Sequence, residues 1–340
     1  MRSKVLIIAE AGVNHNGDLD KALQLIDAAA NAGVDYVKFQ TFKAKNLVQK
    51  SAKKADYQIE NTQNSDSQFE MLQKLEMPEE WYEILIKRAK EKKVKFLSTG
   101  FDEESIDFLD EIGCDFYKIP SGEITNKPYL EHIAFKRKPV IISTGMCDLK
   151  DIQNALSVFT SNGISKGDIT ILHCNTMYPT PMEDVNLKAM NTIATEFNVQ
   201  IGYSDHTLGI EVPIAAVAMG AKVIEKHFTL DRNLPGPDHL ASLIPSELKA
   251  MTSAIRNIEL AISGNGKKEP TESETANLVA ARKSIHLAKD IKTGEVFTKT
   301  HFVMLRPGKG ISPMEINNFI GKKAKNNMEQ WELLKITDVE

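Results

Sequence analysis

Two histidines carry the most specific chemical signal in the sequence. His206 and His227 each come at the end of an apolar, strand-like run. If the two runs are neighbouring strands, the imidazoles lie at equivalent heights about 5 Å apart. A lone histidine in such a run is more often a hydrogen-bonded core residue, but a pair can share one metal ion. Glu10 and Asp238 are candidate oxygen donors, and this mixed chemistry favours Mn²⁺, Mg²⁺, Fe²⁺ or Co²⁺ over a structural zinc.

Two lysines indicate a second site. Lys38 and Lys118 lie inside apolar runs, and Ser, Thr and Gly residues end nearby runs at 98–99, 121–122 and 143–145. Ammonium groups, hydroxyls and glycine N–H groups bind phosphate and carboxylate, so the set suits a ligand that carries both. Either lysine could instead form a Schiff base, as in barrel aldolases. The histidine pair argues against that alternative, because Schiff-base aldolases need no metal.

Eight apolar runs, separated by helical patterns, must position these residues. The runs are VLIIAE (5–10), DYVKFQTF (35–42), KFLSTGF (95–101), DFYKIPSG (115–122), PVIISTG (139–145), DITILHCNT (168–176), VQIGYSD (199–205) and AKVIEKHF (221–228). Eight strand–helix units over about 260 residues predict an α/β fold, a (β/α)₈ TIM barrel with catalytic groups at the carboxyl ends of its strands. A doubly wound open sheet is the rival, but it usually carries a Gly-rich nucleotide-binding turn, and the sequence has none.

The composition changes after Gly264. The segment GNGKKEPTESETA is polar and charged, which is typical of a linker. Short strand-like runs and turn signals resume at about Arg282. We therefore predict a barrel at 1–264, a linker at 265–281 and a small domain at 282–340.

Bulk composition excludes several classes of protein. A hydrophobic fraction of 42% and a charged fraction of 26% are ordinary for a soluble globular protein. A net charge of −4, without any Lys/Arg-dense tract, argues against a nucleic-acid partner. The apolar run near the N-terminus is too short for a signal peptide or a membrane span. Three widely spaced cysteines suggest neither a disulfide framework nor a zinc cluster, so we expect a cytoplasmic protein.

Longer motifs resemble those of the sialic acid synthases, a family that includes the legionaminic acid synthases. The matching segments are IAEAGVNHNG (8–17), VKFQTF (37–42), KIPSGE (118–123), ISTGM (142–146), LHCNTMYPTP (172–181), YSDHT (203–207), EKHFTLD (225–231) and GPDH (236–239). RPGKGISP (306–313) is similar to the C-terminal antifreeze-protein-like (SAF) domain of the same family. The resemblance covers nearly the whole chain, and its motifs are highly specific.

The resemblance implies a barrel followed by a SAF domain, in a domain-swapped homodimer. It implies a divalent metal at His206 and His227, usually Mn²⁺, with Mg²⁺ or Co²⁺ as alternatives. Phosphoenolpyruvate is expected at Lys38, Thr99, Lys118, Ser121 and Ser143. The sugar is expected at Glu10, Gln40, Asn175, Tyr178 and Asp238, and at Arg306 reaching in from the partner chain.

The sequence departs from the family pattern at two places. The third strand reads STGF, where the family usually has STPF, so Gly100 stands next to the expected phosphate site. Some members place the asparagine of the sixth strand one residue later, where this chain has Thr176. Others have an acidic residue at the position of Met177. The differences at Thr176 and Met177 bear on the assignment of Asn175 and on sugar specificity.

The resulting expectation is an N-acetylneuraminate synthase, which condenses phosphoenolpyruvate with open-chain N-acetylmannosamine. The alternative is an N,N'-diacetyllegionaminic acid synthase, which uses 2,4-diacetamido-2,4,6-trideoxymannose, and a phosphorylated sugar is a third choice. In this chemistry a metal polarises the sugar aldehyde, water adds and phosphate leaves by C–O cleavage, with Glu10 as general base or water-positioning group. Ketodeoxyoctonate and shikimate-pathway synthases are rivals that do not need the SAF-like tail. A binding module on an inert barrel is disfavoured by polar residues at all eight strand ends.

Overall fold

The computed structural model of the chain describes residues 4–62 and 65–340. The chain divides into two compact units, Met1–Gly264 and Asn265–Glu340. Within the described residues, no helix is long and apolar enough to cross a membrane.

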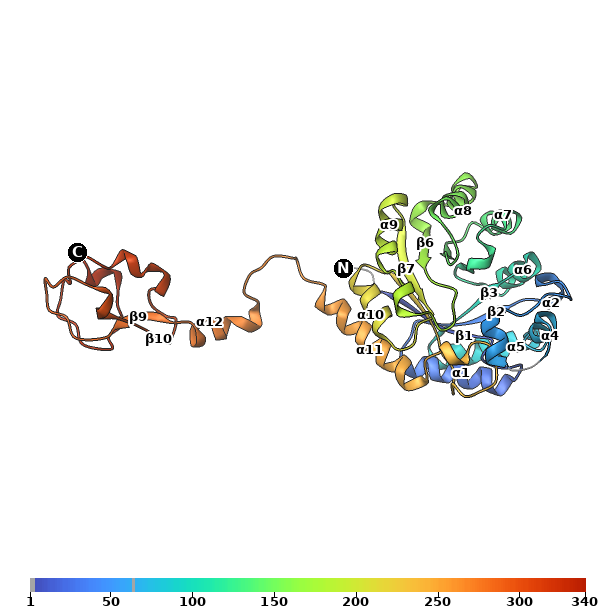
Figure 1. Cartoon of the computed structure of the whole chain (residues 1–340), viewed down its shortest axis with the longest axis horizontal. Helices are drawn as coiled ribbons and strands as arrows, with labels where there is room; N and C mark the ends of the chain where they lie inside the picture. Colours follow the sequence, from blue (N-terminus) through green and yellow to red (C-terminus); the bar gives the residue numbers. More distant parts are fainter. Residues whose placement is uncertain (1–3, 63–64) are drawn as a thin grey trace. The chain divides into compact units, whose positions relative to one another are not determined.

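The first unit is a barrel of parallel strands. Its strands are β1 (Leu6–Gly12), β2 (Tyr36–Thr41), β3 (Lys95–Gly100), β4 (Tyr117–Ile119), β5 (Val140–Ser143), β6 (Ile169–His173), β7 (Gln200–Asp205) and β8 (Val223–His227). They are hydrogen-bonded in the order β3-β2-β1-β8-β7-β6-β5-β4, and β3 packs against β4, so the ring nearly closes (Figure 1). Each strand contains part of one of the runs predicted from the sequence, and the predicted (β/α)₈ barrel is confirmed.

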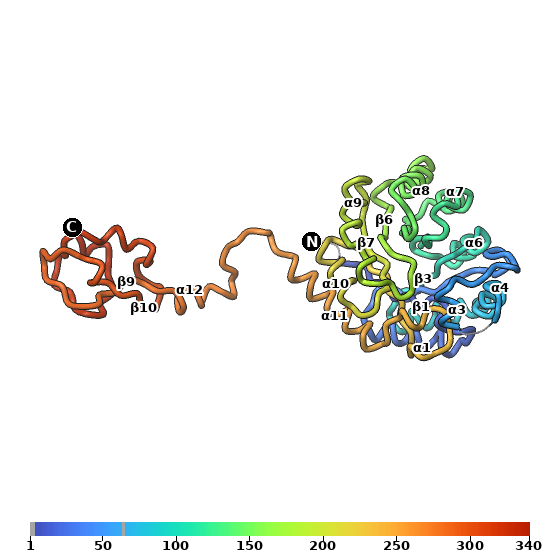
Figure 2. Tube along the Cα trace, viewed as in Figure 1, coloured from blue at the N-terminus to red at the C-terminus, as the bar shows by residue number. Residues whose placement is uncertain are grey.

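Helices surround this ring of strands, as the traces in Figures 1 and 2 show. The long outer helices are α1 (Leu19–Ala32), α5 (Glu80–Lys92), α6 (Glu103–Glu111), α7 (Lys127–Phe135), α8 (Leu149–Ser161), α9 (Lys188–Phe197), α10 (Glu211–Ala218) and α11 (Pro245–Ala261). Short 3₁₀ turns flank three of the strands. They are η1 (Ser121–Glu123) after β4, η2 (Lys166–Asp168) before β6, η3 (Met182–Asp184) after β6 and η4 (His239–Ala241) after β8.

Helix α1 illustrates why the sequence forms these elements. The side chain of Asp18 accepts a hydrogen bond from the N–H of Lys21 and caps the first turn. Leu25 and Ile26 lie on the buried face, against the barrel. The helix ends at Gly33, which adopts a left-handed φ of 76° at no steric cost.

A long excursion lies between β2 and α5. It contains α2 (Ala44–Leu47), α3 (Asp56–Thr62) and α4 (Gln68–Gln73), for which the sequence analysis predicted no elements. These helices are too short to show a clear apolar stripe. Helix α4 is nevertheless well defined by a capping box, in which Ser67 and Glu70 exchange hydrogen bonds.

The second unit has its own small core. An antiparallel pair, β9 (Ser284–Leu287) and β10 (Phe302–Leu305), packs with buried apolar residues such as Phe297 and Leu334. Short turns complete it: η5 (Glu272–Glu274), η6 (Lys299–His301), η7 (Pro313–Asn318) and η8 (Ile336–Asp338). Helix α12 (Thr275–Ala281) occupies the end of the segment that we predicted as linker. The carbonyl of Val279 accepts a 2.8 Å hydrogen bond from the N–H of Gly308.

Candidate active site

The inward-facing side chains of the barrel change from apolar to polar over two residues along the strands. Inward-facing side chains alternate along a strand, so residues two apart share a face. Lower in the barrel, the inward positions of β1, β2, β3, β5 and β8 form one apolar cluster: Ile8, Tyr36, Leu97, Ile141 and Val223. Two residues later, the same strands carry buried polar groups: Glu10, Lys38, Thr99, Ser143 and Glu225. At the carboxyl ends of the strands, the inward-facing side chains thus form a polar layer above an apolar one.

A cavity of about 570 Å³ opens over this polar layer. Every predicted site residue except Asn175 and Arg306 lines it. The structure therefore brings together side chains from all eight strands or the loops that follow them, over most of the length of the first unit: Glu10, Lys38, Gln40, Thr99, Lys118, Ser121, Ser143, Tyr178, His206, His227 and Asp238. Convergence of this kind is typical of TIM-barrel active sites.

The two lysines lie in a buried cluster of alternating charge. Lys38 Nζ is 2.7 Å from Glu10 Oε2 and 3.6 Å from Glu225 Oε2. Lys118 Nζ is 3.3 Å from Glu225 Oε1. All four side chains are nearly inaccessible to solvent. Ser204 donates a 2.9 Å hydrogen bond to Glu225 and fixes the carboxylate that the two lysines share.

Burial and charge move the pKa values of this cluster in different directions. Burial alone would raise the pKa of Glu225, but Lys118 and Lys38 lower it to about 2. Burial raises the pKa of Glu10 despite its pairing with Lys38. Burial alone would lower the pKa of Lys38, but the carboxylates of Glu10 and Glu225 raise it. Burial does lower the pKa of Lys118, which has one close carboxylate. Lys118, which has fewer close carboxylates than Lys38, is therefore the lysine better placed to pair with an anionic ligand.

Hydroxyl groups surround the lysines. Lys38 donates to Thr99 Oγ1 and Lys118 to Ser143 Oγ, each over 2.8 Å. Ser121 Oγ accepts a 2.9 Å hydrogen bond from the N–H of Gly145. A Cβ at Gly145 would come within 2.4 Å of Thr176, so only glycine fits this approach. The hydroxyls and lysines together can bind phosphate and carboxylate oxygens.

The two predicted metal ligands lie side by side at the opposite part of the ring, on β8 and just after β7. Their ring centroids are 5.3 Å apart. His206 Nδ1 donates to the main-chain carbonyl of Asn175, which leaves a lone pair on Nε2. Among the residues that the structure describes, none forms a hydrogen bond with the buried Nδ1 atom of His227. Burial lowers the pKa of His206 to about 4 and also lowers that of His227, so both rings are neutral, as metal ligands must be.

These observations fit a metal held by two imidazoles and completed by substrate or water. Among residues 4–62 and 65–340, no group of three or more His, Cys, Asp or Glu side chains is arranged to hold a metal. Asp238 comes nearest, with Oδ2 4.0 Å from His227 Nδ1. Burial, and then the charge of Glu10, raises the pKa of Asp238 to about 7. Since the pKa shifts favour the neutral forms of both groups, this contact is no salt bridge.

Aromatic rings cover the histidine side of the cavity. Tyr178 stacks on His206 with centroids 4.1 Å apart, and Tyr57 from helix α3 stacks on Tyr178 at 5.2 Å. Gln40 Nε2 donates to Glu10 Oε1 over 3.2 Å. Planar rings beside amide and carboxyl groups suit a sugar, whose apolar faces and hydroxyl edges alternate.

Two predicted residues lie elsewhere. The side chain of Asn175 accepts a 2.7 Å hydrogen bond from the N–H of Met177, and Thr176 takes its place in the cavity lining. Arg306 directly follows β10 in the second unit and is exposed. Their contacts with substrate remain predictions.

Sequence reasoning also missed residues that the structure places in the site. Glu225 could have been found, because it precedes His227 by two residues and so faces inward with it. No sequence signal pointed to Tyr57, which lies in the excursion after β2.

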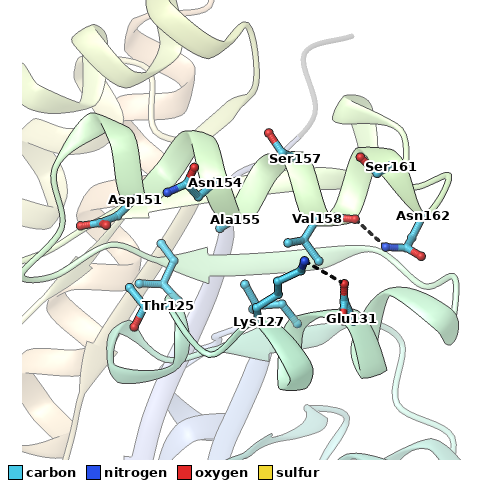
Figure 3. A pocket seen from close by; sticks show the side chains of 12 residues that line it. Thr125, Lys127, Glu131, Asp151, Asn154, Ala155, Ser157, Val158, Ser161 and Asn162 are labelled. Atoms are coloured by element: carbon cyan, nitrogen blue, oxygen red, sulfur yellow. Dashed lines mark hydrogen bonds and ion pairs between the residues drawn. The ribbon is translucent and has the colours of Figure 1, made fainter.

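A second cavity, of about 470 Å³, lies outside the barrel between α7 and α8 (Figure 3). Lys127 and Glu131 form an ion pair 3.6 Å long along one side of it, and Asp151 and Asn154 lie on the other. None of the predicted site residues lines it. The cavity at the barrel mouth is therefore the candidate active site.

Comparison with known proteins identifies the family of the chain. Residues 25–268 match the NeuB family, and residues 282–340 match the SAF domain. The chain belongs to the NeuB family. This confirms the family resemblance and the SAF domain predicted from the sequence, and with them an enzyme of the sialic acid synthase type, a C–C bond-forming transferase.

Individual relatives of this NeuB-family chain differ in their named products. It is 52% identical to an N,N'-diacetyllegionaminic acid synthase of Campylobacter jejuni over 98% of this chain and 99% of that one. It is also 52% identical to an N,N'-diacetyllegionaminic acid synthase of Legionella pneumophila, over 95% and 91% of the two chains. The crystal structure of an N-acetylneuraminic acid synthetase from Leptospira borgpetersenii superposes with a TM-score of 0.70 at 35% identity, covering 81% of this chain and 90% of that chain.

Proposed function

We propose that this enzyme condenses phosphoenolpyruvate with 2,4-diacetamido-2,4,6-trideoxymannose and forms N,N'-diacetyllegionaminic acid. The observation that carries the proposal is the 52% identity, over nearly full length, to two proteins named as synthases of this product. The sequence analysis ranked N-acetylmannosamine first and this sugar as the alternative. The relatives favour the alternative, since the similarity to the N-acetylneuraminic acid synthetase is lower, at 35% identity.

The lysine cluster suits phosphoenolpyruvate. This substrate carries a phosphate and a carboxylate, and the cluster offers two ammonium groups with hydroxyls at Thr99 and Ser143. Fixed donors in a site that excludes water stabilise charge more strongly than the same groups in solution. Lys38 and Lys118 would therefore both bind the anion and stabilise the phosphate as it leaves.

Glu10 would act as the general base for the water that attacks phosphoenolpyruvate. In the reaction, the methylene carbon of phosphoenolpyruvate bonds to the aldehyde carbon of the open-chain sugar. Water then adds to the neighbouring enol carbon, and the C–O bond to phosphate breaks. Burial raises the pKa of Glu10, so this carboxylate can accept a proton from the attacking water. Its hydrogen bond from Gln40 and its ion pair with Lys38 hold it in place.

His206 and His227 would hold a divalent metal, for which we propose Mn²⁺. Their neutral rings, and the unpaired Nδ1 atom of His227, support this assignment. When bound there, the metal would supply Lewis-acid polarisation of the aldehyde oxygen. Tyr178, stacked on His206, would position the sugar beside it.

The compartment and the assembly are also part of the proposal. The three cysteines are free, which is compatible with a reducing cytoplasm. We further propose a homodimer in which the SAF domain of one chain reaches the barrel of its partner.

The test is a phosphate-release assay with phosphoenolpyruvate and three sugars in parallel: the diacetamido-trideoxy sugar, N-acetylmannosamine and N-acetylmannosamine 6-phosphate. We expect the first to give the highest kcat/KM and a chelator to abolish turnover. A higher kcat/KM with either other sugar would overturn the substrate assignment. Full activity after metal removal would overturn the metal assignment.

Matched histidine variants separate the metal from general effects on folding. His206→Ala and His227→Ala should each lose turnover and bound Mn²⁺ while the circular dichroism spectrum stays unchanged. His132→Ala is the control, because His132 pairs with Asp107 on the outside of the barrel and should leave both properties as they are.

A further inference from the structure

One wall of the active-site cavity is apolar, whereas the strand ends that line the rest of the cavity are mostly polar. The wall comes from the excursion between β2 and α5 and consists of Phe42, Leu47, Val48, Met71, Leu72 and Leu75, here called the outer wall. The strands contribute lysines, carboxylates and hydroxyls, whereas the outer wall contributes aliphatic and aromatic carbon. A reaction between two polar substrates does not by itself require such a surface.

The outer wall has its own hydrophobic support. Phe42, Met71 and Leu75 are buried and, with Val13, form a cluster separate from the barrel core. Phe42 also packs edge-on against Phe101, with ring centroids 5.9 Å apart. Leu72 and Leu47, by contrast, are only partly buried, although they pack against the same cluster. The cluster therefore fixes the wall, and the partly exposed leucines present side-chain surface to the cavity.

The excursion that carries the outer wall contacts the part of the cavity where the sugar is expected to bind. Phe42 follows Gln40 by two residues at the end of β2. Helix α3, from the same excursion, places Tyr57 on the ring of Tyr178. Asn61, also on α3, donates a 2.6 Å hydrogen bond to the carbonyl of Pro237, the neighbour of Asp238. These contacts join the excursion to the residues expected to bind the sugar.

The excursion brings amide groups but no charge into the cavity. Among its residues that the structure describes within 42–62 and 65–75, no charged side chain lines the cavity. Its polar lining includes the side-chain amides of Gln58 and Gln68. An acetamido substituent has the same two parts, an amide that hydrogen-bonds and a methyl group that prefers an apolar surface. A phosphate would need cationic donors, and this wall has none to offer.

We propose that the outer wall is the specificity subsite for the second acetamido group and the 6-deoxy methyl group of the sugar. This inference rests on the proposed function and names the residues that would select its substrate. A methyl group of the sugar that packs against Leu47 and Leu72 is removed from water, which is favourable. A sugar hydroxyl at the same place would lose its hydrogen bonds to water without gaining a partner, which is unfavourable. Discrimination by one or two such groups in an apolar pocket is about 10–200-fold.

The test compares kcat/KM for the diacetamido-trideoxy sugar with kcat/KM for N-acetylmannosamine. The wild-type enzyme should prefer the first sugar by about 10-fold or more. Leu72→Asn should reduce that ratio at least severalfold, mainly by raising the KM of the diacetamido sugar, and should leave the KM of phosphoenolpyruvate unchanged. Leu47→Gln changes a different helix of the excursion and should reduce the ratio in the same direction. Leu72→Met, which keeps an apolar side chain, should restore the preference.

Leu260→Asn is the matched control. Leu260 is 74% exposed on α11, outside the cavity, so the same change should leave both sugars unaffected. If the wild type prefers the diacetamido sugar but neither leucine variant changes the ratio, the outer wall is not the selector and the proposed function stands. If the wild type does not use the diacetamido sugar, the proposed function fails, and this inference with it.

Discussion

Glu225 is the buried counter-ion of Lys118, with its Oε1 atom 3.3 Å from the lysine Nζ. The other oxygen of the same carboxylate lies 3.6 Å from Lys38 Nζ. One carboxylate thus contacts both lysines at the polar end of the barrel, while Glu10 forms a second, shorter ion pair with Lys38. Because phosphoenolpyruvate brings negative charge of its own, the same arrangement stabilises the empty site and prepares it for an anion.

Replacing Glu225 with glutamine should expose this dual role. Breaking a buried ion pair on one side costs about 3–5 kcal/mol, so Glu225→Gln should lower the free energy of unfolding by about that amount. Phosphoenolpyruvate should raise the melting temperature of the variant more than that of the wild type, because the ligand replaces the lost negative charge. Thermal denaturation with and without the ligand measures both effects. Glu131→Gln, at an exposed ion pair on α7, is the control. Equal ligand-induced shifts in variant and wild type would contradict this role.

The neighbouring residue, Lys226, shows what the sequence could not reveal. Polar residues end all eight predicted strands, and the sequence analysis treated this polarity as evidence of an active site. In the structure, Lys226 and Asp205 instead pair with each other, both fully buried, at adjacent positions of β8 and β7. Neither residue lines the cavity. Glu225, Lys226 and His227 are consecutive, and neighbouring residues of a strand point to opposite faces. The orientation of β8 in the barrel therefore decides that Glu225 and His227 line the cavity and that Lys226 does not.

The buried Lys226–Asp205 pair should matter for stability. Lys226→Met leaves Asp205 as an uncompensated buried charge and should lower the free energy of unfolding by about 3–5 kcal/mol in urea denaturation. Lys95→Met is the control, since the Lys95–Asp115 pair is exposed and such a pair contributes less than about 1 kcal/mol. Adding Asp205→Asn to Lys226→Met should recover part of the loss. A double variant less stable than Lys226→Met alone would refute the charge argument.

The barrel itself was predictable from the sequence, because apolar runs and helical patterns alternate with a clear rhythm. The pairing of His206 with His227 followed from that rhythm, since each ends a strand and the strands are neighbours. The excursion after β2 was not predictable in the same way. Its helices are short, and Tyr57 reaches the site only through tertiary contacts with Tyr178. Local patterns carry no information about such contacts between distant segments.

The lysine assignment can be tested by substrate-specific kinetics. Lys118→Met removes one ammonium group beside Ser143 but keeps the length and apolar stem of the side chain. The KM of phosphoenolpyruvate should rise by about 10–100-fold, as expected for the loss of a buried charged hydrogen bond worth about 1.5–3 kcal/mol. The KM of the sugar should change much less. Lys127→Met, on the outer surface of α7, should change neither. A change in the sugar KM alone would show that this half of the cavity has been assigned to the wrong substrate.

Arg306 raises a different question, because it lies in the SAF domain. It is exposed at the end of β10, and so its guanidinium is available to a ligand. Five donors in a rigid plane suit the hydroxyls and amide carbonyls of a sugar. The family resemblance implies that this arginine acts in the active site of the partner chain. The alternative is that it braces the turn at Pro307 to Gly310 within its own domain.

Complementation between two inactive chains distinguishes these roles. Arg306→Ala and His206→Ala should each be inactive as homodimers, and mixing them should allow the chains to exchange. If Arg306 acts across the dimer, one site of each mixed dimer carries both changes and the other carries neither. Phosphate release should then return to about one quarter of the wild-type rate, because half of the dimers are mixed and each has one intact site. If Arg306 acts within its own chain, every site in a mixed dimer is damaged. No recovery, with chain exchange verified by mass spectrometry, would therefore rule out the swapped arrangement.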